Sequence, residues 1–325
     1  MTQHFKNLLL AFVSSWAFLI GTSAHAQKYP DRPVRIVVPF ATGGPADNYA
    51  RFLAQRLSDA LGQSFVVDNR PGAGSLIGTD AVAKAAPDGY TLLMMSNTQT
   101  VNETLIANKP YSLLRDLTGV APVNYSDLVL VVHPGTGIQS LGDLIKRAQS
   151  QPGKLTYASS GSGTPYHMAG ELLKSLAKID LLHIPYKGSS GARTDVLGGQ
   201  VDMMFDAVTT MTEQAKAGKV KAIATSGRQR SDVLSDVPTL GEAGVANYEA
   251  TIWLGVMAPK ATPKAIVEQL NAAITKIVSQ PEIKQQWSKQ GATPMIMGVA
   301  AFDKYLQDDV QKWASVIRSA NIKLD

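Results

Sequence analysis

The chain has 325 residues, with 31 lysine or arginine and 26 aspartate or glutamate side chains, so its net charge is +5. This small excess forms no block of five or six like charges, and nucleic-acid binding is therefore not expected. Cysteine is absent, which excludes disulfides, thiol catalysis, cysteine-based zinc sites and iron–sulfur clusters. The length is sufficient for two ordinary domains with hydrophobic cores.

The N-terminus has the pattern of a signal peptide covering residues 1–26. Lys6 precedes an apolar or small stretch at 8–20, which is too short to span a bilayer because a spanning helix needs about 20 residues. Residues 24–26 (Ala-His-Ala) form a small-x-small cleavage site, so the mature chain is expected to start at Gln27. The alternative is an uncleaved membrane anchor. No later segment is apolar for long enough to cross a membrane, which predicts a soluble exported protein.

Short apolar runs alternate with helical patterns along the rest of the chain. The runs are nearly continuous in apolar residues, which is typical of strands covered on both faces. They are VRIVVPF (34–40), SFVVDN (64–69), YTLLMMS (90–96), DLVLVVH (127–133), KLTYASS (154–160), DLLHIPY (180–186), VDMMFDA (201–207), VKAIATS (220–226) and IWLGVMAP (252–259). Helical spacing of apolar residues at 45–61 and 166–177 predicts helices between the strands. This alternation predicts an α/β protein with parallel sheets and helices on both faces.

The predicted strands are too many for one open sheet, which favours two sheets and two domains. We expect domain 1 to comprise 27–124 and 251–325, and domain 2 to comprise 125–250. Two helices at 263–279 and 300–319, with no strand between them, are expected to complete domain 1. Two short strand-like connections would act as a hinge. Ligands of open α/β sheets bind outside the carboxyl ends of the strands, so the site is expected in the cleft between the domains.

The turn after the first strand is a candidate for holding a negatively charged ligand. Its two glycines allow close approach of the backbone, and Pro45 occupies the favoured first position of the next helix. Asp47 follows in the first helical turn, where it could satisfy the helix dipole, orient the loop or meet an ammonium group of the ligand. The candidate ligand-binding residues here are Phe40, Ala41, Thr42, Gly43, Gly44 and Asp47.

Two later strand-to-helix turns resemble the first in design. The segment YASSGSGTPYHMAGELL ends a strand near Ser159, turns through glycines and offers Thr164 as an N-cap before a proline. The third strand ends in a polar run instead. The candidate residues of these two turns are Ser159, Ser160, Thr164, Ser96, Asn97 and Thr98. The first N–H groups of a helix lack internal partners and carry about half a positive charge, so opposing turns could hold a carboxylate at micromolar affinity, about −8 kcal/mol.

Two further candidate residues carry more than one interpretation. His167, beside the proposed cleft, could be structural, ligand-facing or catalytic. Asp206, at the end of a strand, could cap the next helix or face the cleft and accept hydrogen bonds there. The histidines lack metal-ligand spacing, and neither a phosphate-loop motif nor a nucleophile-elbow motif is present. We therefore expect no metal, no cofactor and no catalytic residue.

Four segments in order resemble the Bug family, the periplasmic solute-binding proteins of tripartite tricarboxylate transporters. They are YPDRPVRIVVPFATGGPADNYAR, VVDNRPGAGSLIGTDAVAKAAPDGYTLL, YASSGSGTPYHMAGELL and HIPYKGSSGARTDVLGGQVDMMFD. The resemblance runs over essentially all of 29–325 and implies a type II periplasmic-binding-protein fold. It implies that 40–44 with Asp47, and Ser159, Ser160 and Thr164 opposite, hold a ligand carboxylate. Asp206 matches a cleft residue.

The leading hypothesis is therefore a periplasmic, non-catalytic and monomeric receptor for a small carboxylate. The ligand could be a di- or tricarboxylate, an amino acid or an aromatic acid, delivered to the membrane components of a tripartite tricarboxylate transporter. One alternative is a ligand-sensing partner of a membrane sensor kinase. Another is an exported serine hydrolase that uses Ser160 or Ser162 with His167.

Overall fold

The computed structural model describes residues 29–323. The predicted signal peptide, residues 1–26, lies outside the described residues. Arg32–Asp325 forms one compact unit, which contains all the helices and strands of the described residues. Within the described part of the chain, no helix has both the length and the apolarity that a membrane span requires.

The first part of the chain forms three strand–helix units. Their strands are parallel, with β1 between β2 and β3. The elements are β1 (Val34–Val38), α2 (Pro45–Leu61), β2 (Phe65–Asn69), α3 (Leu76–Ala83), β3 (Thr91–Ser96) and α4 (Asn97–Leu105). A short 3₁₀ turn (Ala73–Ser75) precedes α3, and the short helix α5 (Leu113–Asp116) follows α4. The strands are short and almost fully apolar because helices cover both of their faces.

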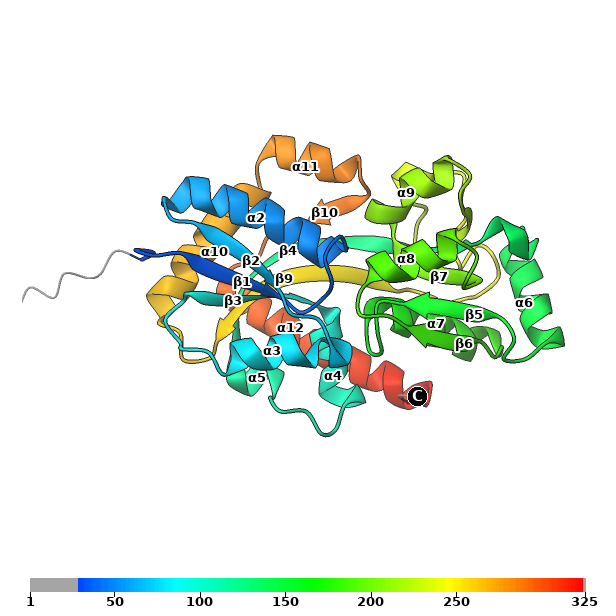
Figure 1. Cartoon of the computed structure of the whole chain (residues 1–325), viewed down its shortest axis with the longest axis horizontal. Coiled ribbons are helices and arrows are strands. Elements are labelled where there is room, and N and C mark those ends of the chain that lie inside the picture. Colours follow the sequence, from blue (N-terminus) through cyan, green and yellow to red (C-terminus); the bar gives the residue numbers. More distant parts are fainter. Residues whose placement is uncertain (1–28, 324–325) are drawn as a thin grey trace, which may run out of the picture. The chain divides into compact units, whose positions relative to one another are not determined.

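One long strand, β4 (Leu117–Val132), links these units to the rest of the sheet. Its first part pairs with β9 (Thr251–Pro259), and its last part pairs with β7 and β8, all antiparallel. The first part of β4 belongs to one sheet and its last part to a second, so β4 joins the two into a ten-stranded array. This pairing agrees with the expectation of two sheets, whereas the expectation of parallel sheets is wrong, because both contain antiparallel pairs. Figure 1 shows β4 and β9 side by side through the middle of this array. We call β1, β2, β3, β9 and β10, with the first part of β4, the first half. The second half comprises β5, β6, β7 and β8 with the last part of β4.

The second half repeats the strand–helix plan. Strand β5 lies between β6 and β7 and is parallel to both. The elements are α6 (Leu141–Ser150), β5 (Thr156–Ser159), α7 (Pro165–Ala177), β6 (Leu182–Pro185), α8 (Ser189–Leu197), β7 (Met203–Ala207), α9 (Val208–Lys216) and β8 (Lys221–Thr225). Each parallel strand thus ends next to the N-terminus of a helix at the same edge of the sheet.

The C-terminal segment returns to the first half. It contains α10 (Lys264–Val278), α11 (Pro281–Ser288), β10 (Ala292–Pro294) and α12 (Val299–Ser319). The expectation of no strand between the last two predicted helices is wrong, because β10 pairs antiparallel with β4 there. Its three residues end in proline and are too few to show a strand periodicity.

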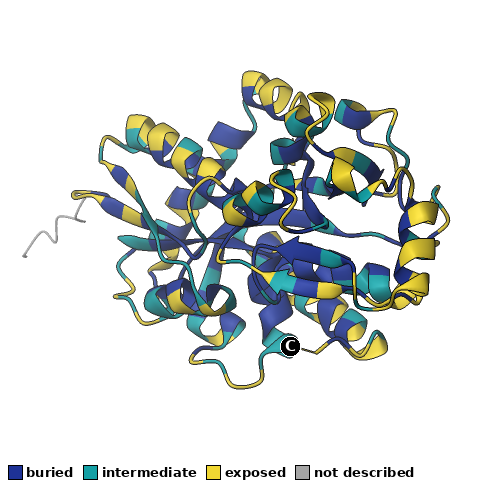
Figure 2. Cartoon of the chain, turned by 45° about the vertical axis from the view of Figure 1, so that its right-hand side comes forward, coloured by how far each residue is buried: buried dark blue, intermediate teal, exposed yellow. Residues whose placement is uncertain are grey.

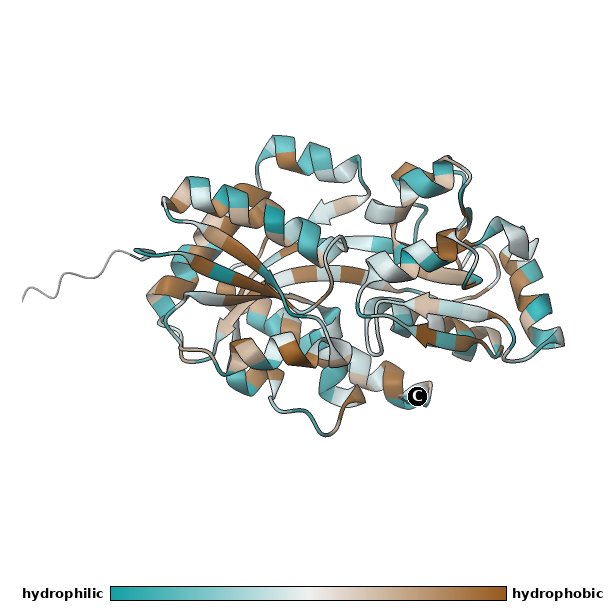
Figure 3. Cartoon of the chain, viewed as in Figure 1, coloured by the Kyte–Doolittle hydropathy of each residue, from teal (hydrophilic) through white to brown (hydrophobic). Residues whose placement is uncertain are grey.

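The alternating side chains of β4 divide the core of the second half between two helical layers. Leu128, Leu130 and Val132 face α6 and α7, whereas Val129 and Val131 face α8 and α9. Figure 2 shows the strands buried and the exposed residues gathered on the outer sides of the helices. Figure 3 shows apolar residues both on strands of the sheet and as stripes along the helices. Burial on both faces explains why these strands appear in the sequence as continuous apolar runs.

Helix α12 is held against α4 by a hydrogen bond to a buried carboxyl group. The Thr100 hydroxyl on α4 donates to Asp309 Oδ2 at 2.5 Å, and Asp309 is only 8% exposed. Further along α12, Trp313 and Ile317 pack against Met168 of α7. Helix α12 therefore packs against α4 and also against α7, a helix of the second strand–helix repeat.

We expect replacement of Asp309 with asparagine to change how stability depends on pH. Burial raises the pKa of the Asp309 carboxyl to about 6, with Thr100 opposing the shift. Between about pH 4 and 6 the folded state keeps a proton that the unfolded chain has lost, so this group makes stability fall as pH rises. The variant should be about 1–3 kcal/mol more stable than the parent at pH 7 and equal to it near pH 3. Urea titrations across this range measure the difference, and exposed Asp308→Asn, which should show none, is the control.

Candidate functional site

A small cavity lies where the carboxyl ends of the strands of both halves meet. Its lining residues come from the turns after β1, β3 and β5, from the start of α8 and from β9. They are Phe40, Ala41, Gly44, Pro45, Ala46, Ser96, Thr98, Ser160, Pro165, Tyr166, Ser189 and Ile252. None of these residues carries a charged side chain, so any charge on a ligand would have to be met by dipoles.

The N-termini of four helices converge on this cavity. Pro45 opens α2, Ser96 is the N-cap of α4, Pro165 opens α7 and Ser189 opens α8. All four residues line the cavity. The first N–H groups of each helix have no partner within the helix, and each macrodipole adds about half a positive charge at this end. The cavity therefore has a positive potential without any basic side chain on its wall.

The loop after β1 is held in place from behind. Gly43 adopts a φ of 81°, which favours glycine, and its N–H donates to Asp47 Oδ2 at 2.9 Å. Arg51 pairs with the same carboxylate at 3.0 Å. Although burial opposes the effect, the hydrogen bonds from Arg51 and Gly43 lower the pKa of Asp47. Of the roles considered for Asp47, the structure shows it orienting the loop.

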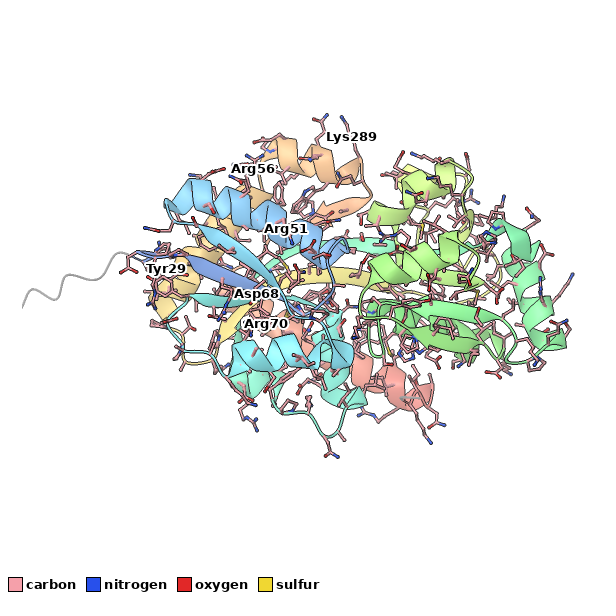
Figure 4. The ribbon with its side chains drawn as sticks, viewed as in Figure 1. Tyr29, Arg51, Arg56, Asp68, Arg70 and Lys289 are labelled. Carbon is pink, nitrogen blue, oxygen red and sulfur yellow. The ribbon has the colours of Figure 1, made fainter. Side chains whose placement is uncertain are left out.

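Basic residues around this loop are also paired outside the cavity. Figure 4 shows Arg51 on α2, with Asp68 and Arg70 at the end of β2. Arg70 Nε lies 2.8 Å from Asp68 Oδ2, and Arg51 also donates to Asn69 Oδ1 at 3.1 Å. Asn69 in turn donates to the Phe40 carbonyl at 3.1 Å. This network fixes the end of β1 without placing a charge in the cavity.

The loop after β5 is organised by its own side chains. Thr164 caps α7 by accepting from the His167 N–H at 3.5 Å and donates to the Gly161 carbonyl at 2.7 Å. His167 Nδ1 accepts from the Gly163 N–H at 3.1 Å. The His167 ring stacks on His183, with ring centroids 4.2 Å apart, and His183 Nε2 lies 2.6 Å from Ser159 Oγ. His167 and Ser159 therefore shape the loop from behind and do not line the cavity.

The turn after β3 is closed by a capping box. Ser96 Oγ accepts from the Thr98 N–H, and Gln99 Oε1 accepts from the Ser96 N–H at 3.0 Å. Asn97 lies behind the turn and donates to the Thr251 carbonyl at 2.9 Å, which ties α4 to the start of β9. Ser96 and Thr98 thus face the cavity while Asn97 connects the turn to the sheet.

Asp206 belongs to a buried ion pair. Its Oδ2 accepts from Arg193 Nε at 2.8 Å, and Oδ1 accepts from the Ala207 N–H at 2.9 Å. The Asp206 side chain is fully buried and that of Arg193 is 15% exposed. Burial raises the pKa of Asp206, and the Arg193 guanidinium opposes that shift. Asp206 is not among the lining residues, and the pair is close enough to Tyr166 on the wall to affect its hydroxyl.

The loops on the two sides of the cavity contact each other. The Ala41 N–H donates to the Lys187 carbonyl at 3.2 Å, and the Ser190 hydroxyl donates to the Thr42 carbonyl at 2.9 Å. Gly188 lies against Ala41 so closely that an added Cβ would be 2.8 Å from the Ala41 Cβ. The first and second halves are therefore closed over the cavity in this structure.

The structure brings some of the predicted site residues to the cavity and places others behind it. The lining includes Phe40, Ala41, Gly44, Ser96, Thr98 and Ser160. Thr42, Gly43, Asp47, Asn97, Ser159, Thr164, His167 and Asp206 lie outside the lining. Sequence reasoning missed six lining residues, which are Pro45, Ala46, Pro165, Tyr166, Ser189 and Ile252. Five of the six are the first or second residue of a helix, and their place directly after a strand-to-helix turn could have identified them.

Comparison with protein families identifies a match over most of the chain. Residues 49–322 match the model of the tripartite tricarboxylate transporter family receptor. Among curated proteins, the chain is similar to Protein BugT of Bordetella pertussis (strain Tohama I), with 38% identity over 320 residues. The match covers 97% of this chain and 98% of BugT.

Solved structures support the same fold. The chain is similar to R. palustris Rpa4515 with adipate, with 32% identity and a TM-score of 0.87 over 91% of this chain and 99% of that one. It is also similar to MatC (Rpa3494) from Rhodopseudomonas palustris with bound malate, with 30% identity and a TM-score of 0.84. That match covers 89% of this chain and 100% of the other. These neighbours confirm the predicted α/β periplasmic-binding-protein fold. The predicted domain boundaries stay a prediction.

Proposed function

Because the chain belongs to the tripartite tricarboxylate transporter receptor family, we propose that it captures a small carboxylate in the cavity described above. It does so in the periplasm and presents the ligand to the membrane components of such a transporter. The family is one of receptors, which confirms the prediction that the protein is not an enzyme and leaves the hydrolase hypothesis without support.

The observation that carries this proposal is the convergence of four helix N-termini on a cavity with an uncharged wall. Backbone N–H groups and hydroxyls can donate to both oxygens of a carboxylate, and each charge-assisted hydrogen bond contributes roughly 1.5–3 kcal/mol. Donors that the loops hold in place need little reordering on binding. The hydroxyls of Ser96, Thr98, Ser160 and Ser189 line the same cavity and supply further donors. This arrangement favours an anion over a cation or a neutral sugar.

The bound ligands of the relatives agree in chemical class. Rpa4515 was solved with adipate and MatC with malate, both of which are carboxylates. Phe40, Pro165 and Ile252 add apolar surface to the wall, which suits a short carbon skeleton attached to the carboxylate. The ligand of this protein is therefore proposed to be a small organic acid.

Isothermal titration calorimetry of the mature protein tests the proposal. The panel comprises mono-, di- and tricarboxylates, amino acids and aromatic acids, each beside its uncharged amide. At least one acid should bind with a micromolar Kd, about −8 kcal/mol, and its amide should bind at least about tenfold more weakly. A panel with no acid tighter than millimolar, or an amide that binds as well as its acid, would contradict a carboxylate site.

A further inference from the structure

Asp127 lies at the point where β4 passes from the first sheet to the second. Its neighbour Ser126 pairs with β10 of the first half, whereas Leu128 on its other side pairs with β7 of the second half. Asp127 itself pairs with Thr251 at the start of β9, and this is the last residue pair between the two strands. A rotation of one half against the other would therefore bend β4 at Asp127.

Ser226, directly after β8, fixes the second-half side of this point. Its hydroxyl accepts from the Leu128 N–H at 2.7 Å and donates to the carbonyl of Ala250. Leu128 and Ala250 belong to the two chain connections between the halves, and Ser226 ties both of them to the second half. Asp127 and Thr251 are the next residues on the first-half side, and they are therefore the ones that would absorb a rotation.

The Asp127 carboxylate is covered by a residue of the second half. Gly227 follows Ser226, and a Cβ added to Gly227 would lie 2.7 Å from the Asp127 carboxyl carbon and 2.9 Å from its Oδ1. Asp127 is partly buried, and its carboxylate makes no hydrogen bond or ion pair with any residue in the described part of the chain. An ionised carboxylate in this place has lost part of its water without gaining a partner, which costs free energy.

The charged groups around Asp127 add to this cost. The titratable residues that line the same surface groove are Tyr125, Asp127, Arg228, Arg230, Asp232 and Glu249. Both arginines of the groove bind other carboxylates. Arg228 Nε lies 2.7 Å from Glu249 Oε2, and Arg230 pairs with a glutamate at 2.9 Å. The neighbouring α11 and β10 contribute only uncharged residues to the groove. Burial and then the charge of Glu249 raise the pKa of Asp127 to about 6.

We propose that Asp127 is a proton-controlled hinge residue, whose protonated form favours the closed arrangement of the two halves and whose ionised form favours an open one. In the closed arrangement the carboxylate lies against Gly227 and near Glu249. Opening at Asp127 would move both away and let water reach the carboxylate, which relieves the cost of its charge. The inference goes beyond the proposed function, because it concerns the free protein and needs no ligand.

The direction of the pH dependence follows from the difference between the two arrangements. Asp127 has a raised pKa in the closed arrangement and returns towards its ordinary value of 3.8 when water reaches it. Between about pH 4 and 6 closed molecules keep a proton that open molecules have lost, so closure becomes less favourable as pH rises. From about pH 4 to 7 the ratio of closed to open molecules should fall by up to about a hundredfold. Such a shift would turn a tenfold excess of closed molecules into a tenfold excess of open ones.

Small-angle X-ray scattering of the free mature protein tests the inference, because the radius of gyration rises when the halves open. The parent should be more compact at about pH 4.5 than at about pH 7.5. Asp127→Asn cannot ionise and should stay compact at both pH values. Glu249→Gln removes the negative charge that raises the pKa of Asp127, so it should move the midpoint of the change to lower pH. Asp309→Asn is the matched control and should behave as the parent, because the pKa of Asp309 is also raised to about 6 but its carboxyl lies between α4 and α12.

Each outcome supports the inference or overturns it. An equal radius of gyration of the parent at both pH values would overturn it, and so would a pH-dependent change that Asp127→Asn retains. Loss of the change in Asp309→Asn would assign it to that carboxyl instead. Circular dichroism checks that the variants are folded, and if Asp127→Asn is not, an unchanged midpoint in Glu249→Gln overturns the inference. None of these measurements uses a ligand, so the proposed carboxylate site stands or fails separately by its own calorimetric test.

Discussion

Replacing Asp206 with alanine should lower the free energy of unfolding by about 3–5 kcal/mol, which would be a severe loss for a single polar residue. The substitution leaves the Arg193 guanidinium buried without its counter-ion, and the Asp206 carboxylate is fully buried in the parent. A charge in such a place costs several kcal/mol because it has lost its water and gains no partner. Urea denaturation followed by circular dichroism measures the change.

Two controls identify the ion pair as the cause. Asp308→Ala removes a partner from the Lys304–Asp308 pair, whose side chains are 74% and 57% exposed, and should change stability by less than about 0.5 kcal/mol. The double variant Asp206→Leu with Arg193→Met removes both charges and should recover most of the loss. A loss below about 1 kcal/mol for Asp206→Ala would contradict a paired, ionised Asp206. Failure of the double variant to recover would point to packing instead.

The role of Asp206 also shows where sequence reasoning reached its limit. A carboxylate at the end of a strand could cap the next helix, face the cleft or form an ion pair, and the residue itself does not distinguish these roles. The role of Asp206 is determined by Arg193, which lies on α8 and contacts Asp206 on β7 only in the folded chain. A charge balance of this kind depends on tertiary contacts, so no local pattern predicts it.

Elements with strong local signals were predicted best. All nine apolar runs contain strands, and the turns after β1, β3 and β5 reach the cavity. The first part of β4 was missed because Gly119, Pro122 and Asn124 interrupt its apolar pattern, and its pairing with β9 contains two irregularities there. Missing that part left the two predicted sheets without the long strand that joins them.

The candidate site was predicted at the level of loops and not of side chains. Glycine and proline spacing located the turns, because these residues have strong backbone preferences. Which side chain of a turn faces the cavity depends on the direction in which the helix leaves the loop. Tyr166 and His167 are neighbours in sequence, yet only Tyr166 lines the cavity while His167 stacks on His183 behind it.

Gly188→Ala should weaken ligand binding by about tenfold to a hundredfold and leave the stability of the free protein nearly unchanged. The residue has an extended backbone with φ of 167°, so alanine brings no backbone strain. Its Cβ would lie 2.8 Å from the Ala41 Cβ and 3.0 Å from the Ala41 nitrogen, across the cavity. Overlap of this size costs roughly 1–3 kcal/mol, and it arises only when the two loops are in contact. If ligand binding requires the closed arrangement, the apparent affinity falls by the fraction of molecules that can still close.

Calorimetry with the tightest acid of the panel measures the affinity, and urea denaturation measures the stability of the same variant without ligand. Gly298→Ala is the matched control, because Gly298 has a φ of −70° and no atom within 4 Å of the added Cβ. Equal affinities for the parent and Gly188→Ala would mean that binding does not need the contact between the two loops. A parallel loss of stability would place the overlap in the free protein as well, and the lost affinity could then not be assigned to closure. Weaker binding with unchanged stability would show that this contact contributes to capture of the ligand and not to folding.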